Sequence, residues 1–395
     1  MVKEDIHNLK GVLDRNSEKY LLQLFPDDQE DVRRFTNNLL AQGISAGRVV
    51  KYLYSLVSIR RRLNKSFRSA KEDDIKRFVV GLEKSEYAEW TKHDLKIILK
   101  KYLHWLDRGD MISWLKVKTI KNRKLPEEVL TEEDIKALAG AAYTTRDKGF
   151  IFSLYESGCR IGEFLPLKIK HLNFDKYGAV LRVTGKTGDR RIRLVASTLA
   201  LQSWLSDHPC KNDPDAYLWC KTPATNNPKW KNNHLSYGFI SRLLEELAEK
   251  AGVKKAVNAH AFRHARATFM ASRLKEPEMR EFFGWGSDSE MPGTYVHLSG
   301  RDIDNSVLSI YGYQDVARLQ EPLLKVKPCP RCQETSDPAS RFCKKCGMPL
   351  DERYDVDKLE GLVVDFLKVM SEFFPQAKDK FREIVKSRGA ESLFS

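Results

Sequence analysis

Two arginines, a lysine, a histidine, a tryptophan and a tyrosine form a set of side chains that could act together on one phosphodiester. They are spread over about a third of the chain: Arg160, Lys186, His260, Arg263, Trp285 and Tyr295. Two guanidinium groups can hold the non-bridging oxygens of a phosphate through planar, charge-assisted hydrogen bonds. A lysine and a histidine can move protons at the bridging oxygens while the phenol attacks phosphorus. The set predicts metal-independent chemistry on DNA.

The histidine and the second arginine lie three residues apart. On a helix, His260 and Arg263 therefore face the same side, and His264 could join or support them. Such a pair on a helix is more often an ordinary surface or core feature, so it gains weight only from the residues that follow it.

The tyrosine lies in a segment rich in turn-forming residues. Residues 283–297 contain three glycines and a proline, which predicts an exposed, mobile loop that could move Tyr295 towards a ligand. Tyr311 and Tyr313 lie close enough in sequence to be alternative nucleophiles.

Apolar residues at helical spacing predict four helices between residues 26 and 108, and Ser69 with Glu72 predicts a capping box before the third. The four apolar faces are Val32, Phe35 and Leu39; Val49, Tyr52 and Leu56; Ile75, Phe78, Val79 and Leu82; and Leu95, Ile98, Leu99 and Tyr102. The unit is basic, since residues 1–125 hold 27 Lys and Arg against 17 Asp and Glu, within a chain of net charge +14. This excess favours a polyanionic partner. The candidate DNA-binding residues are Arg60, Arg61, Arg62, Lys65, Arg68, Lys96, Lys100 and Lys101.

The pattern becomes mixed after a basic linker. A new helix is expected to start at Thr131, and another, around residues 150–154, to stop at Gly158 just before Arg160. The alternating segment 180–184, the turn 185–188 and the segment 191–194 predict a hairpin with Lys186 at its tip.

Four of the seven cysteines form two Cys-x-x-Cys pairs separated by ten residues: Cys329, Cys332, Cys343 and Cys346. Each tight turn can aim two thiolates at one tetrahedral ion, and the metal can supply folding energy that so short a segment lacks. We expect one structural Zn²⁺ site here rather than disulfides, and no cofactor for catalysis.

The predicted fold is mainly α with a small β-sheet. The predicted divisions are an N-terminal extension (1–25), an all-helical core DNA-binding domain (26–115), a basic linker (116–126), a mixed α/β catalytic domain (127–320), a zinc-ribbon-like module (327–350) and a C-terminal helical tail (351–395). No apolar run reaches membrane-spanning length and the first residues do not resemble a signal peptide, so we expect a cytoplasmic, nucleoid-associated protein without a membrane partner.

Three sequence boxes, in order, resemble those of the tyrosine recombinases, the phage-integrase family of site-specific DNA recombinases. They are Ser157-Gly-Cys-Arg160-Ile-Gly-Glu163, His260-Ala-Phe-Arg263-His264, and Gly284-Trp285 through Tyr295-Val-His297. The resemblance covers roughly residues 26–318, and the run Met291–Arg301 is most similar to archaeal mobile-element members. The four-cysteine module lies outside the commonest family plan.

The resemblance implies a role for each matching residue. Arg160 and Arg263 would bind the scissile phosphate, Lys186 would protonate the leaving 5′-hydroxyl, and Tyr295 would form a 3′-phosphotyrosine without ATP. His260 would act on the tyrosine's proton, while Glu163 and His264 would support the site. Trp285 stands where many members have histidine; its N–H can donate a hydrogen bond but cannot shuttle a proton.

The resemblance further implies double-stranded DNA with specific recombination sites as substrate and a homo-oligomer, a tetramer on DNA. Two alternatives remain open from the sequence. One is a type IB topoisomerase-like enzyme that relaxes DNA, and the other is a non-enzymatic, zinc-containing DNA-binding regulator.

Overall fold

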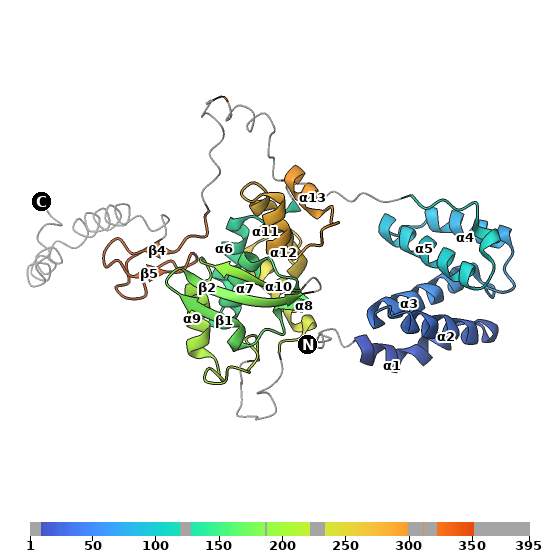
Figure 1. Cartoon of the computed structure of the whole chain (residues 1–395), viewed down its shortest axis with the longest axis horizontal. Coiled ribbons are helices and arrows are strands. Elements are labelled where there is room, and N and C mark those ends of the chain that lie inside the picture. The colour runs from blue at the N-terminus through green and yellow to red at the C-terminus, as the bar shows by residue number, and fades with distance from the viewer. Residues whose placement is uncertain are drawn as a thin grey trace, which may run out of the picture. The chain divides into compact units, whose positions relative to one another are not determined.

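The computed structural model describes residues 9–118, 128–185, 188–221, 234–298, 311 and 322–350. These residues divide into two compact units (Figure 1). Within the described residues, the first comprises 9–118 with the short segments 161–166 and 234–240, and the second comprises 128–160, 167–221 and 241–350 with the gaps given above. The predicted C-terminal helix and most of the predicted linker lie outside the described residues.

The first unit is all-helical, as predicted. Its helices are α1 (Leu9–Leu21), α2 (Pro26–Ala41), α3 (Ala46–Leu63), α4 (Glu72–Glu83) and α5 (Glu89–Trp105), followed by the 3-10 turn η1 (Gly109–Ile112). All four predicted apolar faces are buried in one core. Periodicity locates these helices because each must bury one stripe of side chains against its neighbours.

The helical unit begins earlier than expected. Helix α1 occupies most of the segment predicted to be an extension, and it contacts α3. Leu21 and Leu24 are buried in the same core, and Glu18 accepts a hydrogen bond from Arg33 at 3.1 Å. Its mixed polar sequence hid this helix, because only contacts with α3 reveal which residues it buries.

The predicted capping box at Ser69 and Glu72 is wrong. Helix α4 does begin at Glu72, but the backbone N–H of Lys71 donates to Asp74 at 3.0 Å, whereas the Ser69 hydroxyl donates to the Ser66 carbonyl. By contrast, Thr131 caps the next helix as predicted, since its hydroxyl accepts a hydrogen bond from the Asp134 N–H.

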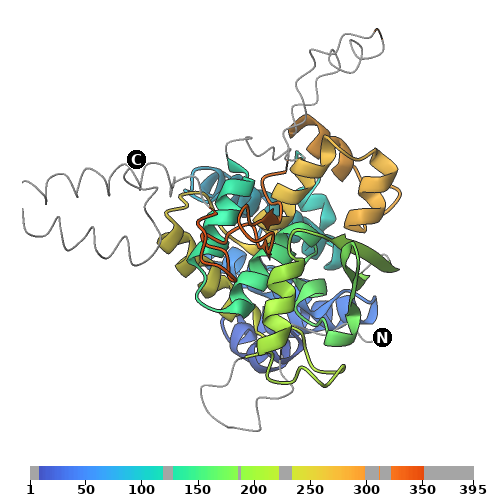
Figure 2. The ribbon, with the colours of Figure 1, turned by 90° about the vertical axis from the view of Figure 1, so that its left-hand side faces the viewer.

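The chain after residue 127 forms a three-stranded antiparallel sheet and further helices (Figure 2). They are α6 (Glu132–Ala141), α7 (Thr145–Ser157), α8 (Ile161–Phe164), η3 (Ile169–His171), α9 (Thr198–Asp207), α10 (Tyr237–Ala251), α11 (Ala259–Ala271), α12 (Glu276–Phe283) and α13 (Met291–Leu298). The strands are β1 (Leu172–Asp175), β2 (Gly178–Gly185) and β3 (Gly188–Leu194), in the order β1-β2-β3. The mainly helical fold with a small sheet is confirmed.

The predicted hairpin is strands β2 and β3, whose register runs from Ala179 opposite Leu194 to Gly185 opposite Gly188. Strand β3 contacts α7 and α12, so the sheet is attached to the helix that precedes Arg160 and to the helix that precedes Trp285. Strand β1 was not predicted because its four residues have only one buried side chain.

The prediction of an exposed loop around Tyr295 is wrong. Residues 291–298 form helix α13, and Tyr295 is 1% exposed. Pro292 lies in the first turn of this helix, where a missing N–H costs nothing, so the turn-forming residues start a helix rather than prevent it.

The described chain ends in the cysteine module. Residues 322–326 lead into β4 (Lys327–Pro328), which pairs with β5 (Thr335–Ser336). Among the described residues, no helix combines the length and apolar character needed to cross a membrane.

Candidate active site

Helix α11 supplies three of the predicted residues. Asn258 caps the helix, because its side chain accepts hydrogen bonds from the backbone N–H groups of His260 and Ala261. The cap fixes the first turn, with His260 exposed at its start and Arg263 buried one turn later. The two side chains therefore face the same side of α11, as the three-residue spacing predicts.

Arg263 joins the first and third sequence boxes. Its Nη1 donates to the carbonyl of Gly158 at 2.8 Å, and its Nη2 donates to the carbonyl of Phe283 at 2.7 Å. The side chain is only 3% exposed. A planar guanidinium can satisfy two carbonyls at a fixed angle to each other, so Arg263 holds two chain segments in place.

Gly158 allows this close approach. It ends helix α7 in the left-handed region, with φ of 56°. A Cβ at this position would lie 2.5 Å from Cε1 of Phe283. Glycine is therefore required both by the backbone conformation and by the aromatic ring packed against it.

Arg160 follows this turn and lies on the exposed side of the site. Its Nη1 donates to the Gly284 carbonyl at 3.4 Å, one residue from the carbonyl that Arg263 contacts. Both arginines are thus anchored on the segment Phe283–Gly284, one exposed and one buried. Glu163, from the same sequence box, is buried in α8.

Tyr295 is packed by aromatic residues and by a histidine. Its ring stacks on Trp285, with centroids 5.5 Å apart and planes 4° apart, and Trp285 in turn stacks on Phe283. The Tyr295 hydroxyl is hydrogen-bonded to Nδ1 of His264. The ring of His260 lies edge-on to that of His264, with centroids 4.2 Å apart.

The phenol is held in its neutral form. Burial raises the pKa of Tyr295 to about 12, although the charges of Arg263 and Arg160 act in the opposite direction. The positive charges of both arginines favour the phenolate, but burial outweighs them, so a neighbouring group must take the proton during attack. His264 contacts the hydroxyl oxygen and is therefore the group placed to take the proton, whereas the sequence interpretation gave this role to His260.

Five of the six predicted catalytic residues are described, and the structure brings them together at one place: Arg160, His260, Arg263, Trp285 and Tyr295. Lys186 lies outside the described residues, but Gly185 and Gly188, which flank the turn of its hairpin, are described and pair with each other. Tyr311, one of the alternative nucleophiles, is 75% exposed, and Tyr313 is not described.

This constellation agrees with comparisons with known proteins. Residues 128–301 match the phage integrase family, and this span contains all of the candidate catalytic residues. The chain is 27% identical over 247 residues to "Tyrosine recombinase XerA" of Pyrococcus horikoshii, which covers 61% of this chain and 80% of the relative. It is 22% identical over 290 residues to "Tyrosine recombinase XerD" of Ralstonia nicotianae, covering 70% of this chain and 92% of the relative.

The chain carries a phage integrase family domain, and its activity is that of a tyrosine recombinase. Solved structures share its fold. The XerH site-specific recombinase, bound to its difH substrate in a pre-cleavage complex, superposes with a TM-score of 0.51 at 19% identity, covering 78% of this chain and 97% of that one. A lambda integrase dimer bound to a COC′ core site gives a TM-score of 0.52 at 16% identity, covering 69% and 78% respectively.

Arg190 is a site residue that sequence patterns did not reveal. It lies on β3 of the recombinase, where its Nε donates to the Phe282 carbonyl at 3.1 Å and its Nη2 lies 3.8 Å from Sγ of Cys159. One side chain thus ties the hairpin to the segments that carry Arg160 and Trp285. The one sequence signal for this role is alternation along the strand: Arg190 shares the inward face of β3 with Ile192, whereas Arg191 and Arg193 lie on the exposed face.

We expect Arg190→Met to lower the rate of DNA cleavage about 10- to 100-fold, since small displacements of a catalytic group have effects of that size. Affinity for DNA should stay near that of the wild type. Single-turnover cleavage at saturating protein measures the effect, and Arg190→Lys should restore part of the rate. Arg193→Met is the matched control, because Arg193 lies on the other face of β3 and pairs with Asp175 at 2.6 Å. Equal losses in both variants would contradict a positioning role.

The predicted DNA-binding residues of the helical unit have contacts within that unit. Lys65 pairs with Asp74 at 2.9 Å and Lys96 with Glu83 at 2.7 Å. Arg68 donates to Asp31 at 2.8 Å, and the Arg60 guanidinium lies 3.8 Å from the centroid of the Phe25 ring. The remaining members contact uncharged groups: Arg61 contacts Gln23, Arg62 contacts Ser58 and Tyr87, Lys100 contacts the Leu115 carbonyl, and Lys101 contacts Tyr52.

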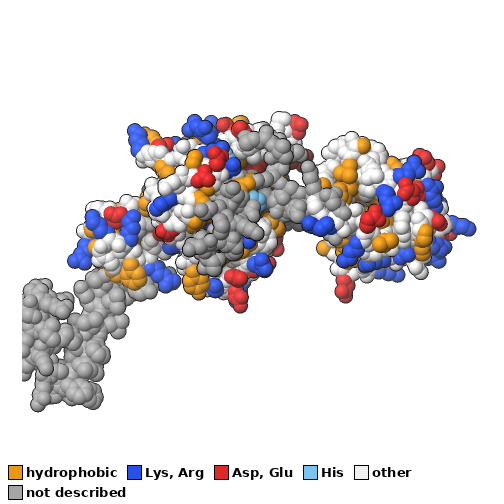
Figure 3. Space-filling model, turned by 90° about the horizontal axis from the view of Figure 1, so that it is seen from below, with side chains coloured by type: hydrophobic (Ala, Val, Ile, Leu, Met, Phe, Trp, Pro, Cys, Tyr) orange, Lys and Arg blue, Asp and Glu red, His pale blue; other side chains and the backbone are white. Residues whose placement is uncertain are grey.

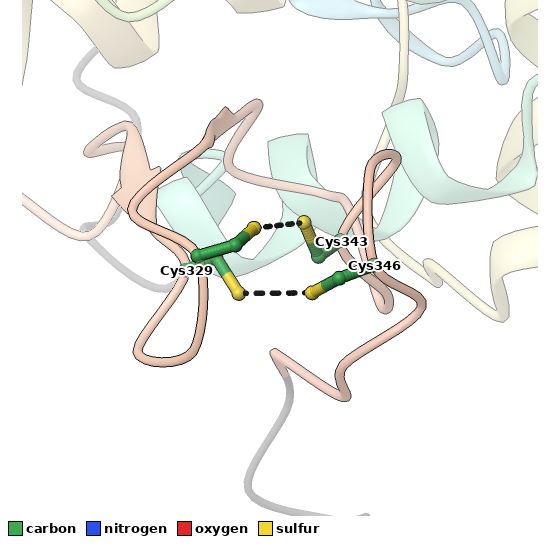
Figure 4. Close-up of side chains that lie close together, drawn as sticks. Cys329, Cys343 and Cys346 are labelled. Carbon is green, nitrogen blue, oxygen red and sulfur yellow. Dashed lines mark hydrogen bonds between the residues drawn. The ribbon is translucent and has the colours of Figure 1, made fainter.

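The four cysteines lie together, as their spacing predicts (Figure 4). All four sulfur atoms are within 4.8 Å of one another; Cys329 and Cys346 are 3.5 Å apart at Sγ, as are Cys332 and Cys343. Ligand sulfurs of a tetrahedral zinc ion lie about 3.8 Å apart, given Zn–S bonds of about 2.3 Å. The backbone N–H of Lys345 also donates to Sγ of Cys343, which favours a thiolate. The cluster could hold a metal ion.

Proposed function

We propose that this recombinase cuts and rejoins double-stranded DNA at specific sites through a covalent bond between Tyr295 and a 3′-phosphate. The observation that supports it most directly is the setting of the Tyr295 hydroxyl. It contacts a histidine nitrogen and lies within the electrostatic reach of Arg160 and Arg263. Nucleophile, proton acceptor and phosphate-binding cations thus meet at one point, which is what transesterification at phosphorus needs.

In the proposed step, the Tyr295 oxygen forms a bond to phosphorus and the bond from phosphorus to the 5′-oxygen breaks. The phenolic proton passes to a histidine of α11, and Lys186 gives a proton to the leaving 5′-oxygen. Arg160 and Arg263 stabilise the negative charge that builds up on the non-bridging oxygens. The reverse step, with a new 5′-hydroxyl, reseals the strand without ATP because the phosphotyrosine keeps the energy of the broken bond.

The two histidines of the box divide the proton transfer in this proposal. His264 takes the phenolic proton, since it contacts the hydroxyl, and exposed His260 acts on the phosphate side. Trp285 cannot exchange protons, and its stacking on Tyr295 supports a positioning role for it.

Covalent trapping tests the proposed function. The full-length protein is incubated, without metal or ATP, with nicked suicide duplexes that carry candidate recombination sites. A denaturant-resistant protein–DNA adduct on some duplexes and not on scrambled ones supports site-specific recombination. Relaxation of supercoiled plasmids that lack any such site would instead indicate a topoisomerase-like enzyme. Tight DNA binding without an adduct on any duplex would indicate a DNA-binding protein without cleavage activity.

We further propose that the protein acts as a homo-oligomer, a tetramer on DNA, in the cytoplasm at the nucleoid. The lambda integrase structure that shares its fold is a dimer on a core site, which supports assembly on DNA. The tetramer rests on the resemblance of the three sequence boxes. Similarity to two Pyrococcus relatives, at 27% and 28% identity, supports an archaeal type.

The cysteine cluster is proposed to hold one structural Zn²⁺. The thiolate set, its spacing and the N–H donor to Cys343 all fit that ion, which would supply the folding energy of residues 327–350. The cluster is formed by other residues than those around Tyr295, so we derive no catalytic step from it.

We therefore expect one zinc per chain by elemental analysis, and none in a Cys329→Ser, Cys343→Ser double variant. A strong chelator should make four further thiols reactive towards a thiol reagent and open residues 327–350 to proteolysis. Cys210→Ser serves as the control, because that residue lies outside the cluster. Retention of one equivalent of zinc in the double variant would contradict the assignment.

A further inference from the structure

The cysteine module carries more positive charge than its size suggests. Residues 322–350 contain six Lys and Arg but only two acidic residues. Five of the six are exposed: Lys325, Arg331, Arg341, Lys344 and Lys345. Figure 3 shows blue side chains around the part of the molecule that contains β4 and β5.

The fold gathers these charges at the metal end of the module. Arg331 lies between Cys329 and Cys332, and Lys344 and Lys345 lie between Cys343 and Cys346. Because all four sulfur atoms are within 4.8 Å of one another, the two short loops that carry these side chains must converge. Arg341 lies two residues before Cys343, and its carbonyl accepts a hydrogen bond from the Leu350 N–H at 2.7 Å.

Both acidic residues of the module are already paired. Glu334 pairs with Lys344 at 3.2 Å, and Asp337 pairs with Lys148 of α7 at 3.8 Å. Within the described part of the chain, Arg331, Arg341 and Lys345 have no acidic partner. A concentrated, uncompensated positive surface of this kind attracts a polyanion.

An aromatic ring lies among these charges. Phe342 is 49% exposed and directly follows Arg341. A half-exposed ring flanked by basic side chains suits contact with a sugar or an accessible base, whereas an apolar protein partner would favour a surface with fewer charges.

The module is attached to the catalytic unit at defined points. The Leu323 N–H donates to Glu132 of α6 at 2.7 Å, and Leu324 is buried. Residues 322 and 324–326 also line a cavity of about 490 Å³ together with Arg266 and Phe269 of α11, the helix that carries His260 and Arg263. A ligand of the module would thus be held in a fixed relation to the active site.

We propose that the module is a second DNA-binding surface, in which Arg331, Arg341, Lys344 and Lys345 contact phosphates and Phe342 contacts a sugar or base of the same DNA. This proposal rests on the proposed function, since DNA is the substrate of the active site. Its role is to add affinity and to fix the position of the substrate, without taking part in cleavage.

The test compares two triple variants of the full-length protein with equal changes in charge. In one, Arg331, Arg341 and Lys345 are each replaced by Gln. In the control, the exposed residues Lys176, Lys211 and Lys254 of the same unit are replaced by Gln. Duplex affinity is measured over a range of salt concentrations, and zinc content and thermal stability are recorded for both.

We expect the module variant to bind duplex DNA about tenfold more weakly at low salt, with the control near wild type. The slope of log K against log salt should fall by up to about 2.7, because each lost phosphate contact removes about 0.9. Phe342→Ala should weaken binding about fivefold with little change in slope, since a ring releases no counterions. Covalent trapping at saturating protein should remain at the wild-type level.

Three results would overturn the proposal. Equal affinities and slopes in the two triple variants would show that the module does not touch DNA. Unchanged DNA binding with lost zinc would mean that the basic side chains only offset the net charge of about −2 on a zinc ion with four thiolates. Unchanged DNA binding with a smaller oligomer would make the surface a protein interface. Absence of trapping by the wild type would instead contradict the proposed function.

Discussion

Tyr295→Phe should abolish the covalent protein–DNA adduct while leaving DNA affinity within about twofold of wild type. The ring keeps its stacking on Trp285, and only the hydroxyl that contacts His264 is removed. Stability should change by about 1 kcal/mol, the usual net contribution of one hydrogen bond. The measurement is trapping on nicked duplexes, resolved on denaturing gels. Because Tyr311 is exposed, Tyr311→Phe is the matched control, and it should form adduct normally. An adduct with Tyr295→Phe but not with Tyr311→Phe would show that Tyr311 is the nucleophile.

The same variant has a signature in alkaline unfolding. Burial raises the folded-state pKa of Tyr295 to about 12, above its ordinary value of about 10. A group with a raised pKa contributes stability that is fully present below pH 10 and is lost as the pH rises to 12. That loss amounts to about 2–3 kcal/mol for two pKa units. Wild type should therefore lose this much stability relative to Tyr295→Phe over that window. Parallel curves for the two proteins would show that the phenol is accessible to water.

Arg263→Lys should lower the cleavage rate on the order of 100-fold or more and also destabilise the protein. A single ammonium cannot reproduce the planar pair of hydrogen bonds to the carbonyls of Gly158 and Phe283. One buried carbonyl then loses its donor, which costs about 1–3 kcal/mol. The loss in rate reflects the weaker stabilisation of charge on the phosphate. Single-turnover cleavage and thermal unfolding measure the two effects.

Arg160→Lys separates the two effects. Arg160 is exposed and makes a long contact with the Gly284 carbonyl, so its replacement should change stability by no more than about 0.5 kcal/mol. Its cleavage rate should nevertheless fall as steeply as that of Arg263→Lys. If Arg160→Lys cleaves at the wild-type rate, Arg160 does not contact the reacting phosphate.

Local patterns predicted the elements whose own residues show a clear periodicity or a turn signal. The four apolar faces between residues 26 and 108 and the hairpin of β2 and β3 follow from periodicity alone. The left-handed end of α7 follows from Gly158, because few other residues adopt that conformation. Helix α1 was missed because what it buries depends on its contacts with α3, and strand β1 was missed because only one of its four side chains is buried.

The site shows the same division. Residue types and their order indicated which side chains take part, and the two pairs of cysteines predicted their own cluster. The setting of Tyr295 was misjudged, since turn-forming residues in sequence say nothing of the aromatic stack that buries it. Likewise, no spacing rule could place Arg190 beside Phe282, or pair Lys65 and Lys96 with carboxylates.

The sequence by itself determined the chemistry available to this protein: two guanidinium groups, histidines, a phenol and a set of four thiols, in an order that indicates their use. Only the tertiary structure decided which of them meet. Arg263 bridges residues 105 and 20 positions away, and His264 meets a phenol 31 residues distant. Such contacts depend on how helices pack, and packing is a property of the whole core rather than of any local run of residues.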